Sequence, residues 1–443
     1  MTLRIGAGAG QAYDRVGPAQ DLAERGDLDF LVFECLAERT LAHGHVERMR
    51  DSAKGYNPML ETRLRSVLPA CRARGTRIVS NMGSANPPAA GEAAARVARE
   101  LGFEGLRIAV VEGDDVTALV DDNTVLPELG TTVATFGRTV VGANAYLGAE
   151  AIAEALEKGA DIVLTGRVAD PSLFLAPIAH HYGWSVTDWD RMACGTAVGH
   201  LLECTTQVTG GYFADPGFKE VPGLDDLGYP IAEVDEDGSA VITKLAETGG
   251  LVSALTVKEQ LLYEVHDPRA YLTPDVAADF SRVRVEDLGG DRVRVSNAGG
   301  RSRPGTLKAL VAFGGGFRAE AEFSYAGPGA QERAELAREI VRRRMTGKFG
   351  CIEPMRFDII GVNSIHATGV TRTTDSEDVR LRFAMRTFDR GWAELLFSEV
   401  DGLHMAGPAG GGGYRNLLTP TVMTQPTFVD RDLVRIRVSM VVA

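Results

Sequence analysis

The sequence predicts an α/β fold in two domains. A doubly wound parallel-sheet domain is expected over residues 1–210, followed by a smaller α+β domain over residues 211–443 that is rich in antiparallel hairpins and partly ferredoxin-like. Three observations predict this fold. The chain of 443 residues is too long for one ordinary core. Its first half alternates strand and helix patterns, and its second half reads as hairpins beside separate helices.

Five short apolar runs in the first half indicate buried strands. They are Leu3–Ile5, Phe30–Phe33, Arg77–Val79, Arg107–Val111 and Ile162–Leu164. Longer segments between them have helical patterns, namely Pro58–Arg74, Ala89–Leu101 and Tyr146–Lys158. Strands that alternate with helices of this length predict a parallel sheet with helices on both faces.

The second half contains three apparent hairpins. Ile231–Lys244 turns at an Asp-Gly pair, Arg282–Ser296 turns at Gly289-Gly290, and Leu307–Tyr325 contains three central glycines. The elements expected after them are a helix at Gln331–Met345, strands near Phe357–Val362 and Val379–Met385, a helix near Trp392–Glu399 and a final strand at Leu433–Val441. Hairpins beside separate helices are typical of an α+β domain.

Composition restricts the classes of partner. A formal charge of −13 argues against nucleic acid and anionic membranes, but allows an anionic small molecule bound by local arginines. The N-terminus lacks a signal-peptide pattern, and no apolar stretch has the length of a membrane span. The five cysteines form no C-x-x-C pair, which argues against a disulfide framework or structural zinc. We therefore expect a cytoplasmic protein and, from its β-rich second half, a homo-oligomer.

Polar residues follow four of the predicted strands. They are Glu34, Glu38 and Arg39 in "FECLAERT", Asn81 and Asn86 in "SNMGSANP", Asp114 in "VEGDDV", and Arg167 and Asp170 in "LTGRVADPSL". Because the carboxyl ends of parallel strands meet at one edge, these residues predict one shared cleft. Arg167 would bind a carboxylate or phosphate of the substrate through two parallel N–H groups of its guanidinium. Alternatively, it forms an ion pair with Asp170.

Two glycine-containing segments suggest contacts with an anion. Gly6–Gly10 does not match the dinucleotide fingerprint, so no redox cofactor is expected; it forms either a backbone nest around Gly8 or a tight structural turn. Gly249 lies in a glycine turn before a helix, which resembles an anion-binding N-terminus. Asp114 and Asp115 could hold Mg²⁺, or could cap the following helix.

His200 and Glu203 lie three residues apart in a predicted helix, which suggests an acid/base couple. Neighbouring Cys204 is interpreted as a buried structural cysteine rather than a nucleophile.

These motifs resemble the AtuA family, the acyclic terpene utilisation proteins. The resemblance extends over nearly the whole chain and includes "FECLAERT", "SNMGSANP", "LTGRVADPSL", "HLLECTTQVTGGYF" and "AGPAGGGGYRN". Members of the family occur in bacterial pathways that degrade citronellol and geraniol as coenzyme A thioesters. The resemblance implies a branched acyl or polycarboxylic substrate, and it carries no agreed catalytic residues.

We therefore expect an enzyme of the lyase type that acts on a carboxylated or CoA-linked acyl substrate, by hydration/dehydration or C–C cleavage. The alternatives are a non-catalytic acyl-CoA-binding subunit of a carboxylase or hydratase complex, and an ATP/Mg²⁺-dependent ligase-like enzyme. The expected catalytic residues are Glu34, Glu38, His200 and Glu203. The expected substrate-binding residues are Gly8, Arg39, Asn81, Asn86, Asp114, Arg167, Asp170 and Gly249.

Overall fold

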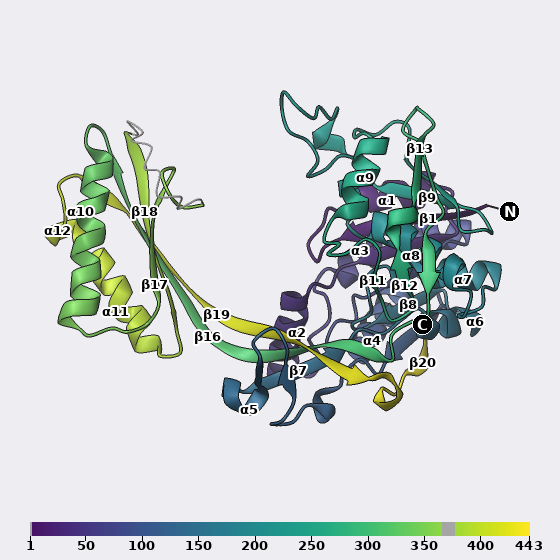
Figure 1. Cartoon of the computed structure of the whole chain (residues 1–443), viewed down its shortest axis with the longest axis horizontal. Helices are drawn as coiled ribbons and strands as arrows, with labels where there is room; N and C mark the ends of the chain where they lie inside the picture. The colour runs from purple at the N-terminus through teal and green to yellow at the C-terminus, as the bar shows by residue number, and fades with distance from the viewer. Residues whose placement is uncertain (1, 366–376) are drawn as a thin grey trace. The chain divides into compact units, whose positions relative to one another are not determined.

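The structure is a computed structural model that describes residues 2–365 and 377–443. The chain divides into two compact units (Figure 1). The first unit combines residues 1–313 with residues 424–443, and the second comprises residues 314–423.

The first unit is built on a large mixed sheet. Its strand order is β13-β14-β10-β9-β1-β2-β3-β8-β4-β20. The parallel centre consists of β1 (Leu3–Gly10), β2 (Phe30–Glu34), β3 (Arg77–Ser80), β8 (Ile162–Thr165) and β4 (Arg107–Glu112). Antiparallel strands flank it, namely β9 (Pro230–Val234), β10 (Ala240–Lys244), β14 (Val293–Ser296) and β13 (Arg284–Asp287) on one side and β20 (Arg437–Val442) on the other.

Two groups of helices cover this sheet. The first group packs on one face in a single apolar core and consists of α1 (Gly17–Arg25), α3 (Leu60–Arg74) and α4 (Pro87–Glu100). A second group of mutually packed helices contacts the parallel strands and consists of α6 (Glu150–Glu157), α7 (Ser172–Tyr182) and α8 (Trp189–Glu203). Strand side chains alternate between faces, so Leu31 and Phe33 join the first core while Val32 between them does not.

The remaining elements of the first unit are short. The helices are α2 (Glu38–Arg50), α5 (Val133–Phe136) and α9 (Ala254–Leu262). The strands are β5 (Val125–Leu126), β6 (Thr131–Thr132), β7 (Val140–Ala145), β11 (Tyr271–Leu272), β12 (Ala277–Asp279) and β15 (Gly299–Arg301).

The second unit has the element order β-α-β-β-α-β. It contains the later part of β16 (Thr306–Ala326), α10 (Ala330–Arg343), β17 (Met355–Ile360), β18 (Asp378–Thr387), α11 (Arg390–Asp401), α12 (Leu403–Ala406) and the earlier part of β19 (Gly411–Asp430). Its sheet order, β17-β18-β16-β19, together with this element order is that of a ferredoxin-like unit. Alternate β16 side chains, including Phe323 and Tyr325, pack in one core with the helices.

The predicted α/β class is confirmed, and the structure differs from the prediction in three details. β1 continues through the Gly6–Gly10 run, so these glycines lie in a strand rather than in a loop. Residues 307–325 are one continuous strand rather than a hairpin, because β16 pairs first with β7 and then with β18. The predicted boundary at 210/211 falls inside the first unit, where β9 pairs directly with β1.

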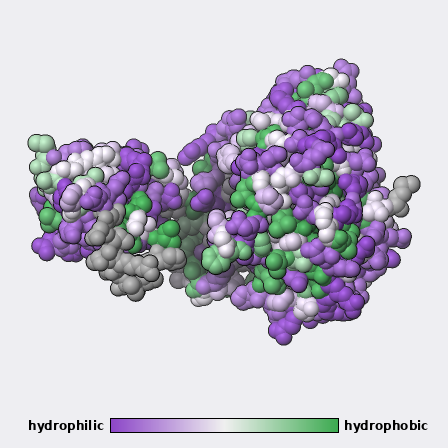
Figure 2. Space-filling model, turned by 90° about the horizontal axis from the view of Figure 1, so that it is seen from above, coloured by the Kyte–Doolittle hydropathy of each residue, from purple (hydrophilic) through white to green (hydrophobic). Residues whose placement is uncertain are grey.

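The surface of the protein is largely hydrophilic in the view of Figure 2, with apolar side chains gathered on parts of the first unit. None of the helices in residues 2–365 and 377–443 has both the length and the apolar character that a membrane crossing requires.

We expect Gly8→Ala to destabilise the protein by about 1–3 kcal/mol. A Cβ atom at Gly8 would lie 2.5 Å from the ring of Phe33, which is itself fully buried and cannot move aside cheaply. The measurement is the free energy of unfolding in urea. Gly17→Ala is the control, because a Cβ there meets no described atom within 4 Å. Equal stabilities of the two variants would contradict the packing argument.

Candidate functional site

Arg167 is the centre of the candidate site and is only 1% exposed. It follows β8, and each of its three guanidinium nitrogens donates to a protein acceptor. Nε donates to the carbonyl oxygen of Val168 at 2.8 Å, and the other two nitrogens donate to the carbonyl of Leu36 and the carboxylate of Asp170. The guanidinium also lies 4.6 Å from the ring centroid of Tyr146. This arrangement contains the ion pair with Asp170, which the sequence analysis gave as the alternative to a guanidinium that binds a carboxylate or phosphate of the substrate.

Asp170 lies just before α7 and pairs with Arg167. The helix that follows is capped by Pro171, so Asp170 is not the N-cap residue, and its carboxylate is free to pair with Arg167. The Asp170 side chain remains 36% exposed. Burial raises its pKa, and the charge of Arg167 opposes that rise. The Asp170 carboxylate therefore contacts the buried guanidinium of Arg167 and is also accessible from outside the protein.

Glu34 ends β2 and is held by two donors. Its Oε1 accepts from the backbone N–H of Leu36 at 2.8 Å and from Nδ2 of Asn81 at 2.9 Å. Asn81 in turn accepts from the backbone N–H of Cys35 at 2.7 Å. Burial raises the pKa of Glu34 to about 8, with a further contribution from Asp170. Burial thus favours the protonated form of Glu34.

His200 and Glu203 contact each other, as their spacing in α8 predicted. Nδ1 of His200 lies 2.9 Å from Oε1 of Glu203. Burial lowers the pKa of His200 to about 4 and raises that of Glu203 well above its usual range. Burial therefore favours the neutral form of each group. In the part of the chain that the structure describes, Nε2 of His200 and Oε2 of Glu203 have no hydrogen-bond partner.

We call Glu34, Asp170 and Glu203 the acid cluster, because each interacts electrostatically with Arg167. Its members come from β2, the segment before α7 and the end of α8. The sequence predicted Glu34 and Asp170 in one shared cleft, and Glu203 separately as part of an acid/base couple. Removal from water favours the neutral form of each acid, and Arg167 is the cation that opposes this effect.

The carboxylate of Asp114 is buried and accepts hydrogen bonds from other parts of the protein. Its Oδ2 accepts from the backbone N–H of Arg167 at 2.7 Å and from Nδ2 of Asn144 at 2.8 Å, and burial raises its pKa to about 6. Asp115 instead pairs with Arg48 at 3.0 Å. No group of three His, Cys, Asp or Glu side chains suited to a metal is found among the described residues. Mg²⁺ at Asp114 and Asp115 stays a prediction.

Three of the predicted substrate-binding residues either bond to the backbone or pack closely against neighbouring atoms, namely Asn86, Gly8 and Gly249. Asn86 caps α4 and donates to the carbonyls of Ser52 and Lys54 at 2.8 and 2.7 Å. Gly8 packs against a phenylalanine ring in the sheet, and a Cβ at Gly249 would lie 2.0 Å from a backbone oxygen. Close packing, rather than an approach to a ligand, accounts for both glycines.

Glu38 and Arg39 begin α2 and do not share a helix with Glu34. Arg39 is exposed. Glu38 accepts from the hydroxyl of Tyr146 at 3.0 Å and from Nζ of Lys308 at 3.0 Å. Glu38 therefore orients two side chains next to Arg167 rather than facing Glu34.

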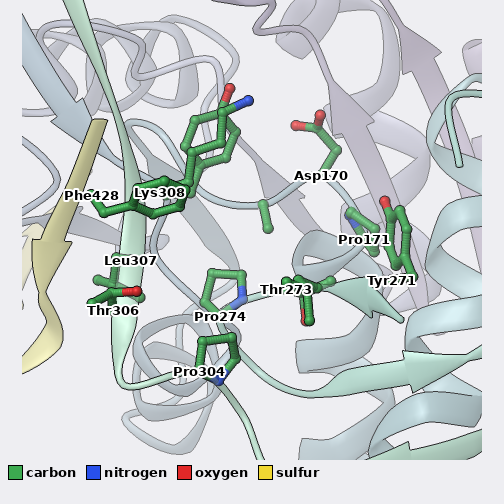
Figure 3. Close-up of a pocket in the computed structure, with 13 residues that line it drawn as sticks. Asp170, Pro171, Tyr271, Thr273, Pro274, Pro304, Thr306, Leu307, Lys308 and Phe428 are labelled. Carbon is green, nitrogen blue, oxygen red and sulfur yellow. The ribbon is translucent and has the colours of Figure 1, made fainter. Parts of the chain in front are cut away.

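A cavity of about 270 Å³ in the first unit adjoins the acid cluster (Figure 3). Asp170 and Tyr271 lie on one side of it and Lys308 and Phe428 on the other. Its lining residues are Tyr146, Ala169, Asp170, Pro171, Tyr271, Leu272, Thr273, Pro274, Pro304, Thr306, Leu307, Lys308 and Phe428. Asp170 is the only member of the acid cluster in this lining.

The sequence analysis missed Tyr146, Tyr271 and Lys308. Two of these residues, Tyr146 and Lys308, carry a sequence signal that could have identified them. Tyr146 directly follows the apolar run of β7, and Lys308 is a single cation within the apolar start of β16. Tyr271 lies in a short strand far along the chain, and no spacing pattern connects it to the first half.

Comparison with known proteins gives one result for almost the whole chain. The family model described as "Acyclic terpene utilisation family protein AtuA" matches residues 3–440. Comparison with curated proteins and with solved structures gave no match.

Replacing Arg167 by alanine is expected to lower the free energy of unfolding by about 2–4 kcal/mol, because it leaves the carbonyls of Leu36 and Val168 without their donor. The lost ion pair adds less, since the Asp170 side chain is 36% exposed. Arg39→Ala is the matched control. Its side chain is exposed, so its effect should stay within about 0.5 kcal/mol. Denaturant unfolding of both variants measures the difference. A loss below about 1 kcal/mol for Arg167→Ala would count against the central role of the guanidinium.

Glu34→Gln should make unfolding less dependent on pH. The pKa of Glu34 in the folded protein, about 8, is above the usual value of 4.5. Its contribution to stability is thus fully present below about pH 4.5 and is lost as the pH rises through about 8. Relative to wild type, the variant should gain stability as the pH increases across this range.

The measurement is urea unfolding at a series of pH values, with Glu104→Gln, which changes an exposed carboxylate, as control. Parallel stability curves for wild type and Glu34→Gln would contradict a protonated Glu34 in the native state.

Proposed function

The chain belongs to the acyclic terpene utilisation family AtuA, and from this premise we propose that it is an enzyme of the lyase type. Membership suggests a role in acyclic terpene utilisation. The proposed substrate is a carboxylated or CoA-linked branched acyl compound. The proposed reaction is hydration/dehydration, or C–C cleavage of a β-hydroxy acid.

The position of Asp170 carries this proposal. It pairs with Arg167 inside the acid cluster and also lines the cavity, so it can exchange a proton with a bound molecule. A carboxylate whose pKa is raised toward neutrality suits a general base. Burial raises the pKa values of Glu34 and Glu203 and favours their protonated forms, so these two acids can hold a proton and give it back.

The cavity supports a small acyl group as the reacting part of the substrate. Much of its wall is apolar, including Pro274, Pro304 and Leu307. A cavity of about 150 Å³ can hold benzene, so about 270 Å³ has room for roughly ten non-hydrogen atoms. Lys308, whose side chain is 47% exposed, offers an ammonium group to a substrate carboxylate.

One observation favours the second candidate, an acyl-CoA-binding subunit that docks onto another enzyme. Tyr212, Phe218, Leu255 and Leu262 are 90%, 87%, 66% and 58% exposed. Leu255 and Leu262 also line a shared surface hollow on α9. Exposed apolar groups of this size mark interaction surfaces in some soluble proteins.

The test begins with thermal denaturation against di- and tricarboxylates, acyl-CoA esters, ATP with Mg²⁺, and NAD. A ligand at 100 times its dissociation constant adds about 2.7 kcal/mol of stability. Any stabilising carboxylate or acyl-CoA is then assayed for turnover by the ultraviolet absorbance of an α,β-unsaturated acyl group and by product analysis.

Asp170→Asn should lower kcat by about 10²–10⁴ while retaining ligand stabilisation, because it removes the base and keeps the shape. Asp122→Asn, which changes an exposed residue, is the control and should keep wild-type kcat. Stabilisation without turnover in the wild type would favour the docking subunit, and stabilisation by ATP alone would favour a ligase-like enzyme.

A further inference from the structure

Tyr271 is held rigidly at the cavity. It belongs to β11, which pairs with β12. Its ring centroid lies 5.1 Å from that of His200 and 4.9 Å from that of Phe280. Its side chain lines the cavity, and its hydroxyl lies on the same side of the cavity as the Asp170 carboxylate (Figure 3). The ring is therefore fixed, and the position of the hydroxyl is fixed with it.

The hydroxyl of Tyr271 is an unused donor. In the same unit, the hydroxyl of Tyr229 donates to Asp14 at 2.5 Å, that of Tyr182 to the carbonyl of Val234 at 2.7 Å, and that of Tyr146 to Glu38 at 3.0 Å. Within residues 2–365 and 377–443, the structure gives the Tyr271 hydroxyl no such partner. The Tyr271 side chain is half-buried and lines the cavity, so its hydroxyl can donate to a ligand there.

We propose that the Tyr271 hydroxyl donates a hydrogen bond to the carbonyl oxygen of an acyl group bound in the cavity and stabilises the enolate form of that group. The inference rests on the proposed function and deepens it, because it identifies the state of the substrate that the site is built to bind. Tyr271 would then be a catalytic residue through direct contact with the reacting carbonyl.

Both proposed reactions form this enolate. In dehydration, a base removes the proton on Cα, and the electron pair moves onto the carbonyl oxygen to give the enolate. The pair then returns to form the Cα=Cβ double bond while the Cβ–O bond breaks, and the β-hydroxyl leaves as water after receiving a proton. In C–C cleavage, a base removes the proton of the β-hydroxyl, and a β-carbonyl forms there. The Cα–Cβ bond breaks, its electron pair forms the enolate, and Cα is then protonated. Neither route needs an oxidant or reductant.

The environment keeps Tyr271 in its donating form. Burial raises the pKa of the phenol well above its usual value, and the charges of Glu203 and Asp170 add to the rise. The hydroxyl therefore keeps its proton across the neutral range and cannot itself serve as a base. A fixed neutral donor near an apolar wall stabilises a developing oxyanion with little reorganisation.

The test uses 4-nitrophenol, whose phenolate oxygen on a flat apolar ring imitates an enolate. Its binding to the purified full-length protein is followed by visible absorbance. We expect saturable binding to the wild type, with about tenfold weaker binding to Tyr271→Phe, which keeps the ring packing and removes the hydroxyl. Tyr212→Phe, at a residue 90% exposed, is the matched control and should bind as the wild type does.

Equal binding by wild type and Tyr271→Phe, or no saturable binding to the wild type, would overturn the proposal. If an acyl substrate turns over, Tyr271→Phe should also lower kcat by about 10²–10³ with a small change in KM. If no acyl compound turns over and the difference in 4-nitrophenol binding is still found, the reaction assignment fails while the donor role of Tyr271 holds.

Discussion

The burial of one guanidinium charge organises the candidate site. A charge removed from water is stable in a protein only when nearby groups replace its hydration. Arg167 meets this requirement with two backbone carbonyls, the carboxylate of Asp170 and the face of Tyr146. These partners come from the segments after β2 and β7 and from the segment that joins β8 to α7, so satisfying the charge fixes three parts of the chain together.

The same constraint sets the protonation of the neighbouring acids. Asp170 forms the direct ion pair with the cation. Glu34 and Glu203 interact with Arg167 without such contact, and burial dominates their behaviour. Asp170 thus faces an accessible cavity, and it is accompanied by two acids whose protonated forms are favoured by burial. Environments that separate the protonation of similar groups in this way are common at catalytic sites, although buried structural networks also produce them.

The sequence predicted the location of the site better than its contacts. Glu34, Asn81, Arg167 and Asp170 are brought together because the carboxyl ends of parallel strands share an edge. Which donor faces which acceptor depends on burial and side-chain packing, and local patterns do not encode these. The sequence therefore left open whether Arg167 binds Asp170 or a substrate.

The second half of the chain was harder to predict. The three glycines after Phe313 suggested a turn, yet the strand continues through them and changes partner from β7 to β18. Residues from a distant segment, such as Tyr271, enter the site through tertiary pairing alone.

The division of the first unit between two stretches of chain affects its synthesis on the ribosome. β20, the edge strand beside β4, lies after the whole of the second unit in sequence. The second unit is one continuous segment, so it can fold while the edge of the larger sheet still lacks its last strand. Until β20 emerges, the backbone groups of β4 that it will pair stay open to other strands. Completion of the larger sheet thus waits for β20, and the open edge of β4 is exposed to mispairing until that strand is made.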